Sequence, residues 1–197
     1  MKLTLTELSN SSYIIVLVPY GSHVYGTNDY SSDTDFIMVV QDGIDCDDQY
    51  STWDTDYSVF SKSHFQKLLD DQYISAIEAF FTTPVKGSFK EFSYKVNKSK
   101  LRESISQRAS NSFVKCKKKL TVETGEERIG MKSLFHSLRM LQFGIQLATT
   151  GHISNFSCAN QYWEAIKDIG PTWSLLNETL KPIYNQLSTD FRVVAPK

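Results

Sequence analysis

The chain has 197 residues, with 21 lysines and arginines against 22 aspartates and glutamates, so its formal net charge at pH 7 is −1. This length is enough to bury a sizeable core in one domain, or in a catalytic core with a helical appendage. The near-zero charge excludes a global basic field that attracts nucleic acid, so any polynucleotide contact needs a local basic patch.

The cysteines and the apolar segments predict the compartment. The three cysteines are far apart and include no C-x-x-C pair, which indicates reduced thiols and excludes a disulfide framework or a zinc site. No signal peptide is evident, and the first apolar run, residues 13–18, is far too short to span a bilayer. We expect a soluble, cytoplasmic protein with no membrane partner; the oligomeric state cannot be inferred.

Two short runs rich in β-branched residues predict buried strands over residues 13–18 and 36–40. Between them lie the sequence G-S-H-V-Y-G at residues 21–26 and the sequence S-D-T-D at residues 32–35. A serine beside a glycine directly after a strand presents backbone N–H groups and a hydroxyl, as phosphate-cradling turns do. This segment is the most informative part of the chain.

Asp33 and Asp35 have the i, i+2 spacing that points two side chains to one face of an extended chain, about 7 Å apart. Two carboxylates held that close repel each other unless a cation lies between them, and the usual cation is a divalent metal with oxygen ligands. Alone, the same string could be an ordinary turn with solvated charges. Together with the anion-binding turn it predicts a nucleoside triphosphate (NTP) with Mg²⁺ or Mn²⁺.

The combination of G-S, a second glycine and D-x-D resembles the signature of nucleotidyltransferases of the DNA polymerase β superfamily. More narrowly, G-S-H-V-Y-G-T-N-x-x-S-S-D-T-D looks like the predicted nucleotidyltransferase family associated with RNA repair pathways. The resemblance implies that Asp33 and Asp35 hold metal ions. It also implies that four residues of the turn hold the nucleotide: Gly21, Ser22, Tyr25 and Gly26.

A third strand is predicted over residues 54–60, where Asp54 and Asp56 share one face. Two-metal phosphoryl-transfer sites generally need a third carboxylate on a neighbouring element, and the family resemblance places an acidic residue at this point. Asp56 is the first candidate and Asp54 the second, with the role of holding the catalytic metal and accepting the proton of the attacking hydroxyl. Both could instead be exposed acids at a strand end.

Two helices are predicted next, one capped by Ser61 or Ser63 and one over residues 73–81. The family usually carries Gly-Asn-Pro between these helices, whereas this chain has D-Q-Y at residues 71–73. The altered turn leaves two interpretations of Glu78, either support of the site or an ordinary acid on a helix surface.

The second half of the chain is predicted to be helical, over about residues 100–120, 129–151, 159–168 and 172–187. Pro182 should kink or break the last helix, and residues 191–197 are expected to form a tail. We therefore expect a catalytic core over residues 1–98 and a helical region over residues 99–197, unless the two form one continuous domain.

Two groups of basic residues lie in this half. The dense cluster Lys115, Lys117, Lys118 and Lys119 either contacts nucleic-acid phosphates or favours a helix C-terminus. Lys132, His136 and Arg139 lie at i, i+4 and i+7 along the border of an apolar helix face, where three cations repel one another unless an anion neutralises them. The helix that carries this row is similar to one that the family places after its catalytic core. That likeness implies contact with the triphosphate or the polynucleotide, and the alternative is a solvated stripe.

These observations predict an α/β fold with a small mixed sheet flanked by helices, and a helical C-terminal half. The expected activity is transfer of a nucleoside monophosphate (NMP) from an NTP to a hydroxyl by a two-metal mechanism. The resemblance implies an RNA end, such as that of a tRNA, as the acceptor. The alternatives are a protein-modifying enzyme of the toxin type that attaches AMP, and a non-catalytic module that binds nucleotide or nucleic acid.

Overall fold

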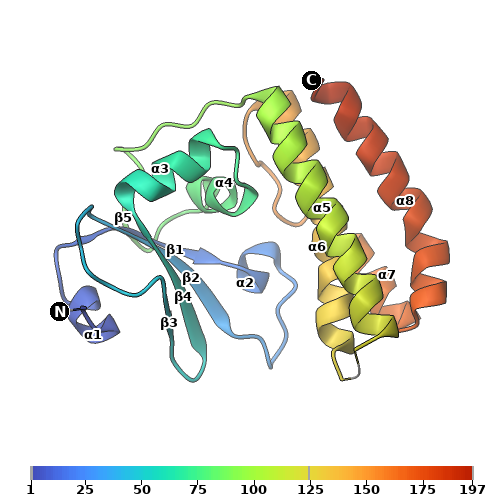
Figure 1. Ribbon diagram of the computed structural model, residues 1–197, viewed down its shortest axis with the longest axis horizontal. Coiled ribbons are helices and arrows are strands. Elements are labelled where there is room, and N and C mark those ends of the chain that lie inside the picture. The colour runs from blue at the N-terminus through green and yellow to red at the C-terminus, as the bar shows by residue number, and fades with distance from the viewer. Residues whose placement is uncertain (1, 124, 197) are drawn as a thin grey trace. The chain divides into compact units, whose positions relative to one another are not determined.

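The computed structural model describes residues 2–123 and 125–196, and the chain divides into two compact units, Met1–Lys95 and Val96–Lys197. The first unit contains a five-stranded mixed sheet with helices, and the second is helical (Figure 1). The predicted α/β class is therefore confirmed. No helix within the described ranges combines the length and the apolar character that a bilayer crossing requires.

The sheet of the first unit has the strand order β3-β4-β2-β1-β5, in which only β2 and β4 pair in parallel. In chain order the elements are α1 (Leu5–Ser9), β1 (Ile14–Tyr20), α2 (Ser22–Tyr25), β2 (Thr34–Val40), β3 (Gln49–Ser51), β4 (Thr55–Ser61), α3 (Lys62–Asp70), α4 (Ile74–Phe81) and β5 (Lys86–Gly87). The three predicted strands correspond to β1, β2 and β4.

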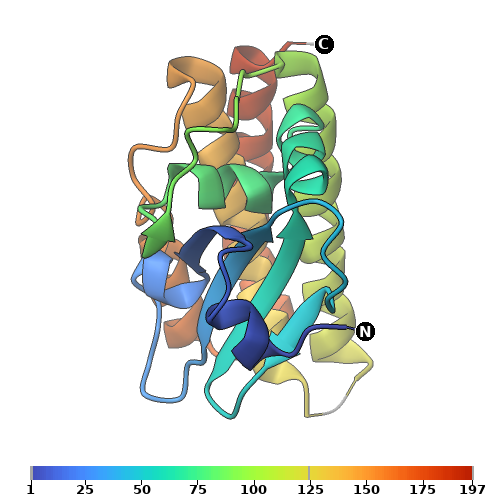
Figure 2. The ribbon, with the colours of Figure 1, turned by 90° about the vertical axis from the view of Figure 1, so that its left-hand side faces the viewer.

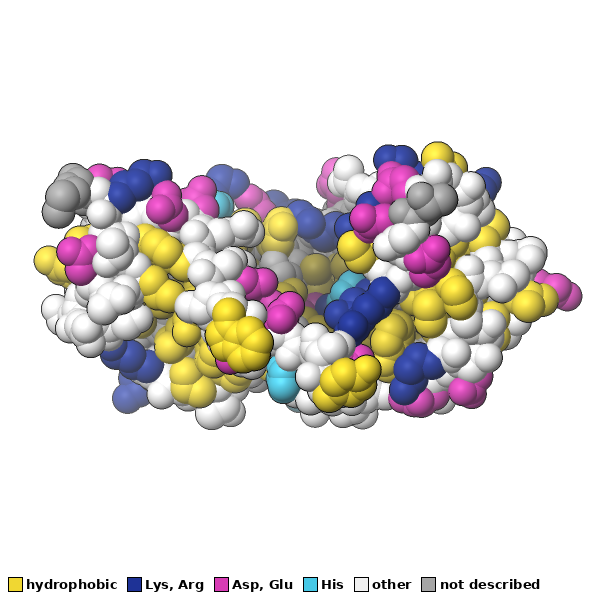
Figure 3. All heavy atoms as spheres, turned by 90° about the horizontal axis from the view of Figure 1, so that it is seen from below, with side chains coloured by type: hydrophobic (Ala, Val, Ile, Leu, Met, Phe, Trp, Pro, Cys, Tyr) yellow, Lys and Arg dark blue, Asp and Glu magenta, His cyan; other side chains and the backbone are white. Residues whose placement is uncertain are grey.

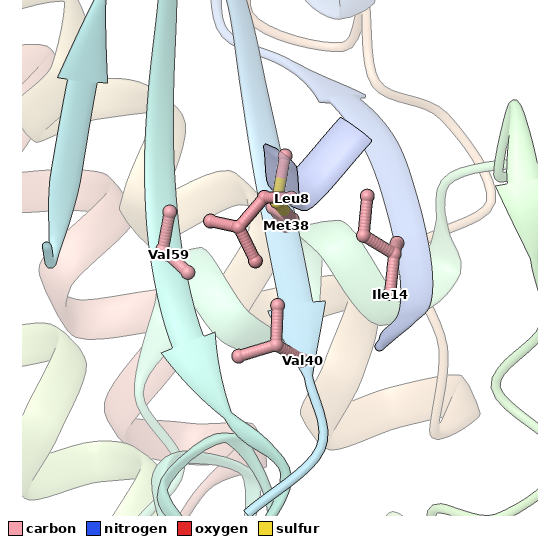
Figure 4. Packing of buried hydrophobic residues seen from close by; sticks show 5 residues of the cluster. All are labelled: Leu8, Ile14, Met38, Val40 and Val59. Atoms are coloured by element: carbon pink, nitrogen blue, oxygen red, sulfur yellow. The ribbon is translucent and has the colours of Figure 1, made fainter. Parts of the chain in front are cut away.

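The two faces of the sheet are covered differently. On one face, Met38, Val40 and Val59 pack with Leu8 of α1 and Ile14 of β1 (Figure 4). Because side chains alternate along a strand, residues 35, 37 and 39 of β2 lie on the opposite face. Helices α3 and α4 pack against that face through β1, β2 and β4.

Two details of local structure complete the first unit. Within the polar stretch of residues 41–52, residues 49–51 form the edge strand β3, in which Tyr50 pairs with Tyr57. The sequence does not indicate this strand, because Gln49 and Ser51 are polar and exposed and Tyr50 alone is partly buried. Ser61 does cap α3, since its side chain accepts a hydrogen bond from the backbone N–H of His64.

The second unit consists of α5 (Lys98–Thr121), α6 (Glu127–Thr150), α7 (Asn160–Ile169) and α8 (Trp173–Val194). Helices α5, α6 and α8 run side by side (Figure 2). The tail expected from residue 191 is wrong, because α8 continues through Pro182 to Val194. Phe191 is fully buried and contacts Gly144 of α6, where a Cβ would lie 2.7 Å from the phenyl ring. That packing stabilises the last turns of α8.

Candidate active site

The register of β2 and β4 brings acidic side chains together at one end of the sheet. Asp35 and Asp56 are direct partners in the parallel ladder, so both side chains point to the same face from strands about 4.8 Å apart. Asp33 precedes Asp35 by two residues and lies just before β2, so the same side-chain direction for Asp33 stays a prediction from the spacing. Asp33 and Asp56 are exposed, and Asp35 is half-buried.

Asp54 and Asp56 differ in what engages their side chains. The carboxylate of Asp54 accepts hydrogen bonds from the hydroxyls of Thr52 and Thr55, at 3.3 and 2.9 Å. Its backbone carbonyl accepts a hydrogen bond from the backbone N–H of Thr34 at 2.9 Å. Asp54 thus stabilises the turn that leads into β4, while Asp56 faces Asp35 across the ladder.

Within the described residues, no group of three or more His, Cys, Asp or Glu side chains converges closely enough to hold a metal ion unaided. The donors that Asp33, Asp35 and Asp56 offer are all oxygen, which fits a hard cation such as Mg²⁺, since proteins usually bind Mg²⁺ through one or two carboxylates together with phosphate oxygens of a substrate.

Gly21 lies against the Asp35 carboxylate. Its backbone has φ 78° and ψ −153°, a conformation that is essentially restricted to glycine. A Cβ at this position would overlap Oδ2 of Asp35 and lie 2.9 Å from its Cγ. The G-S turn and the Asp35 side chain are therefore in direct contact.

Ser22 and Gly26 delimit the short helix α2. Ser22 is its first residue and is half-buried, and Gly26 ends it with φ 71°, a left-handed conformation. The backbone N–H of Thr27 donates to the carbonyl of Ser22 at 3.0 Å, which closes the turn. Ser22 is therefore held just after the end of β1, whose last residue, Tyr20, pairs with Asp35.

Tyr25 fixes this turn to the protein interior. Its side chain is 2% exposed, and its hydroxyl donates a hydrogen bond to the carboxylate of Glu78 on α4, which is 1% exposed. The ring also packs edge-on against Tyr20, with 6.1 Å between ring centroids. Glu78 is thus not a surface acid, and the burial of Tyr25 indicates that it positions the turn.

The altered turn between α3 and α4 is held by Gln72. Gln72 has φ 56°, and its side chain is 1% exposed. Its amide donates hydrogen bonds to the carbonyls of Leu69 and Lys95, at 3.0 and 3.1 Å, and accepts one from the hydroxyl of Tyr94 at 3.2 Å. A single side chain therefore stabilises the turn that directs α4, and with it Glu78, towards the sheet.

The row Lys132, His136 and Arg139 lies on α6 in the second unit. Arg139 is 4% exposed, with its guanidinium 5.7 Å from the ring centroid of Phe135 and 5.5 Å from that of Phe143. It is therefore buried between rings, and not on the border of the helix face as expected. Phenylalanines at i−4 and i+4 were the sequence signal for this burial.

His136 is not a third cation. Burial, together with the positive charges of Arg139, Lys132 and Lys115, holds the pKa of His136 well below its usual range. The imidazole is neutral at pH 7, so the repulsion predicted for three cations reduces to that between Lys132 and Arg139. Contact of this row with a triphosphate stays a prediction.

Part of the lysine cluster at the end of α5 is paired with acids. Lys118 forms an ion pair with Glu123 at 2.6 Å, and Lys119 forms ion pairs with Glu123 and, at 3.2 Å, with Glu126. The two lysines hold the pKa of Glu123 at about 2. Lys115 and Lys117 are exposed and have no acidic partner among the residues that the structure describes.

Comparisons with known proteins leave the function open. No protein-family model and no curated protein matches the chain. Spectinomycin adenyltransferase AAD(9) from Enterococcus faecialis, solved with ATP and spectinomycin, is similar with a TM-score of 0.47 and 14% identity, over 92% of this chain and 93% of that one. A nucleotidyltransferase-like protein from Exiguobacterium sibiricum 255-15 gives 0.35 and 9%, over 96% of this chain and 71% of that one. Likeness at this level assigns no activity, so the function has to follow from the chain's own residues.

Replacing Gly21 by alanine should destabilise the protein much more than the same change at Gly43. Both glycines have positive φ, at 78° and 80°, but nothing lies within 4 Å of a Cβ at Gly43. We expect Gly43→Ala to cost about 1 kcal/mol for backbone strain alone. Gly21→Ala adds the overlap with Asp35 and should cost about 3 kcal/mol or more. Urea denaturation followed by circular dichroism measures both, and equal costs would contradict the contact.

Replacing Tyr25 by phenylalanine should lower the free energy of unfolding by about 1.5–3 kcal/mol, because the buried carboxylate of Glu78 loses the hydrogen bond that the Tyr25 hydroxyl donates to it. Tyr50→Phe is the control in the same unit, since the Tyr50 hydroxyl bonds to neutral backbone groups: it donates to the carbonyl of Leu3 and accepts from the N–H of Asp47. Its cost should be about 1 kcal/mol. If urea denaturation showed a smaller loss of unfolding free energy for Tyr25→Phe than for Tyr50→Phe, the hydrogen bond from Tyr25 would not be what stabilises the buried Glu78 carboxylate.

Proposed function

We propose that this protein is a nucleotidyltransferase, of the kind found in the DNA polymerase β superfamily, that transfers an NMP from an NTP to a hydroxyl. The observation that carries the proposal is the register that sets Asp35 opposite Asp56 while Gly21 touches Asp35. An anion-binding turn and a cluster of carboxylates share one end of one sheet. Such a combination suits a substrate with negative phosphates and bound cations.

The turn after β1 holds the triphosphate in this proposal. The Ser22 hydroxyl and the backbone of the turn donate hydrogen bonds to the β- and γ-phosphates, and the absence of a side chain at Gly21 lets the phosphates approach. Tyr25 and Glu78 hold the turn in place from the core. These residues supply binding and orientation, which is most of what phosphoryl transfer asks of a protein.

The carboxylates of Asp33 and Asp35 would hold two Mg²⁺ or Mn²⁺ ions, and Asp56 would complete the ligands of the catalytic one. Such ions would offset the negative charge of the phosphates and of the departing pyrophosphate. The Asp56 carboxylate accepts the proton of the acceptor hydroxyl as its oxygen bonds to the α-phosphorus. The bond from the α-phosphorus to the bridging oxygen of the β-phosphate breaks, and pyrophosphate leaves with the electron pair.

A module that only binds nucleotides accounts for less of the structure. Binding of a triphosphate requires a turn with anion-binding groups, but not three acids on one face of the sheet. Two of these acids are direct cross-strand partners, an arrangement that destabilises a sheet when no cation is present. The acids therefore favour an enzyme.

An RNA end as the acceptor requires contacts to its phosphates. Lys115 and Lys117 are the candidates, because the other lysines of the cluster pair with acids. On the face that Figure 3 shows, basic and acidic side chains are interspersed. The electrostatic part of RNA binding is thus small and local in this proposal.

The double change Asp33→Asn/Asp35→Asn should abolish transfer of label from NTPs labelled at the α-phosphate, with Mg²⁺ or Mn²⁺ and total RNA present. Removing both carboxylates removes the metal ligands while leaving the size of the side chains unchanged. The loss of rate should be at least about 1,000-fold, as for other charge-stabilising groups removed together. Gel separation of labelled RNA from labelled protein identifies the acceptor.

The matched control is Asp45→Asn/Asp47→Asn, which removes two carboxylates at the same spacing from an exposed loop. This variant should transfer label at the wild-type rate. Unchanged labelling by the Asp33/Asp35 variant would contradict the proposed site, and a labelled protein band in place of labelled RNA would favour the protein-modifying alternative.

Replacing Lys115 and Lys117 by glutamine should reduce the salt dependence of RNA binding. Each lost phosphate contact lowers the slope of log K against log salt by about 0.7–0.9, so the pair should lower it by about 1.5. Lys118→Gln/Lys119→Gln removes the same charge from lysines that are already paired, and should change the slope little. Filter binding over a salt series measures the slope for each variant. Equal slopes for the wild type and the Lys115/Lys117 variant would exclude these two lysines as phosphate contacts.

A further inference from the structure

Helices α5 and α8 enclose a groove of about 690 Å³ in the second unit. Every side chain that lines it is polar or charged, and the groove lies entirely within this unit. On α5 the lining residues recur at helical spacings, and those on α8 do the same. Each helix thus turns one polar stripe towards the other.

Where two helices pack against each other, the side chains between them are normally apolar, because this packing removes apolar surface from water. Further along, α5 and α8 do pack in this way, since Phe113 contacts Trp173 and Tyr184 with ring centroids 5.7 and 4.7 Å apart. Tyr184 also lines the groove, so the groove begins where this packing ends. Pro182 lies inside α8, two residues before Tyr184, and cannot donate a backbone hydrogen bond within the helix.

Each helix contributes one arginine to the lining, Arg102 from α5 and Arg192 from α8. Arg192 is oriented by hydrogen bonds from its Nε to the carbonyl of Ser188, at 2.9 Å, and from its Nη2 to the hydroxyl of Thr189, at 3.4 Å. Arg102 forms no ion pair or side-chain hydrogen bond with the residues that the structure describes. Glu103 is the one acid in the lining, which leaves an excess of one positive charge.

We infer that this groove binds a phosphorylated small molecule of nucleotide size. Two guanidinium groups on opposite walls match the oxygens of one phosphate, because planar guanidinium groups pair with phosphate through parallel hydrogen bonds. The Glu103 carboxylate and the Asn185 amide accept hydrogen bonds from sugar hydroxyls. The volume falls in the range of small-molecule sites, about 300–1,000 Å³.

The groove needs none of the acids at the end of the sheet, so its ligand is distinct from the substrate of the proposed transfer. A phosphorylated ligand here stabilises the pair α5 and α8, because residues of both helices line the groove. The site therefore binds whether or not the chain transfers nucleotides, and the two proposals fail independently.

Isothermal titration calorimetry with AMP, adenosine and inorganic phosphate, in buffer containing EDTA, tests this inference. AMP should bind the wild-type protein, while adenosine and inorganic phosphate should each bind at least about tenfold more weakly, since each lacks half of the contacts. Arg102→Gln and Arg192→Gln should each weaken AMP binding by about tenfold or more. Lys90→Gln, an exposed lysine of the first unit, is the control for charge and should change nothing.

Asp33→Asn/Asp35→Asn should bind AMP like the wild type, which separates this groove from the acidic site. Both arginines lie on the helix surface, so circular dichroism should show that their variants keep the fold. Equal AMP affinity of the wild type and both arginine variants would overturn the inference. So would equal affinity for AMP and inorganic phosphate, or no binding of AMP at millimolar concentration.

Discussion

The contact between the backbone of Gly21 and the carboxylate of Asp35 constrains everything else at this end of the sheet. The chain leaves β1 at Tyr20, which pairs with Asp35, and must then turn directly over that carboxylate. Only a residue without a side chain fits there, and only glycine adopts the required φ and ψ readily. The antiparallel ladder thus fixes the anion-binding turn and the first acid relative to each other, and the parallel ladder adds Asp56.

The acidic residues around this contact differ in their surroundings. The carboxylate of Asp54 is engaged by two threonine hydroxyls of its own turn, so this acid shapes the entry to β4. Glu78 is buried and holds the turn through Tyr25. Carboxylates of one chemical type therefore differ in role because of their surroundings. Asp35 and Asp56, which are paired across strands, repel each other, and we propose that cations offset this repulsion.

The sequence was sufficient for features that depend on local patterns. The strands around the G-S turn were predictable from β-branched runs. Contacts between distant segments were not predictable: Tyr25 and Glu78 are 53 residues apart, and nothing local marks either as buried. Phe191 falls in the stretch expected to be a tail, and Pro182 was expected to kink or break the helix before it, whereas packing against α6 outweighs the lost backbone hydrogen bond.

The central claim is electrostatic, namely that acids crowded at the end of β2 and β4 hold divalent cations together with a triphosphate. Electron paramagnetic resonance of Mn²⁺, with and without a non-hydrolysable ATP analogue, measures this directly. The account predicts that the analogue strengthens Mn²⁺ binding to the wild-type protein and that this gain is absent when Asp33 and Asp35 are asparagine. Equal Mn²⁺ binding by the two proteins in the presence of the analogue would contradict it.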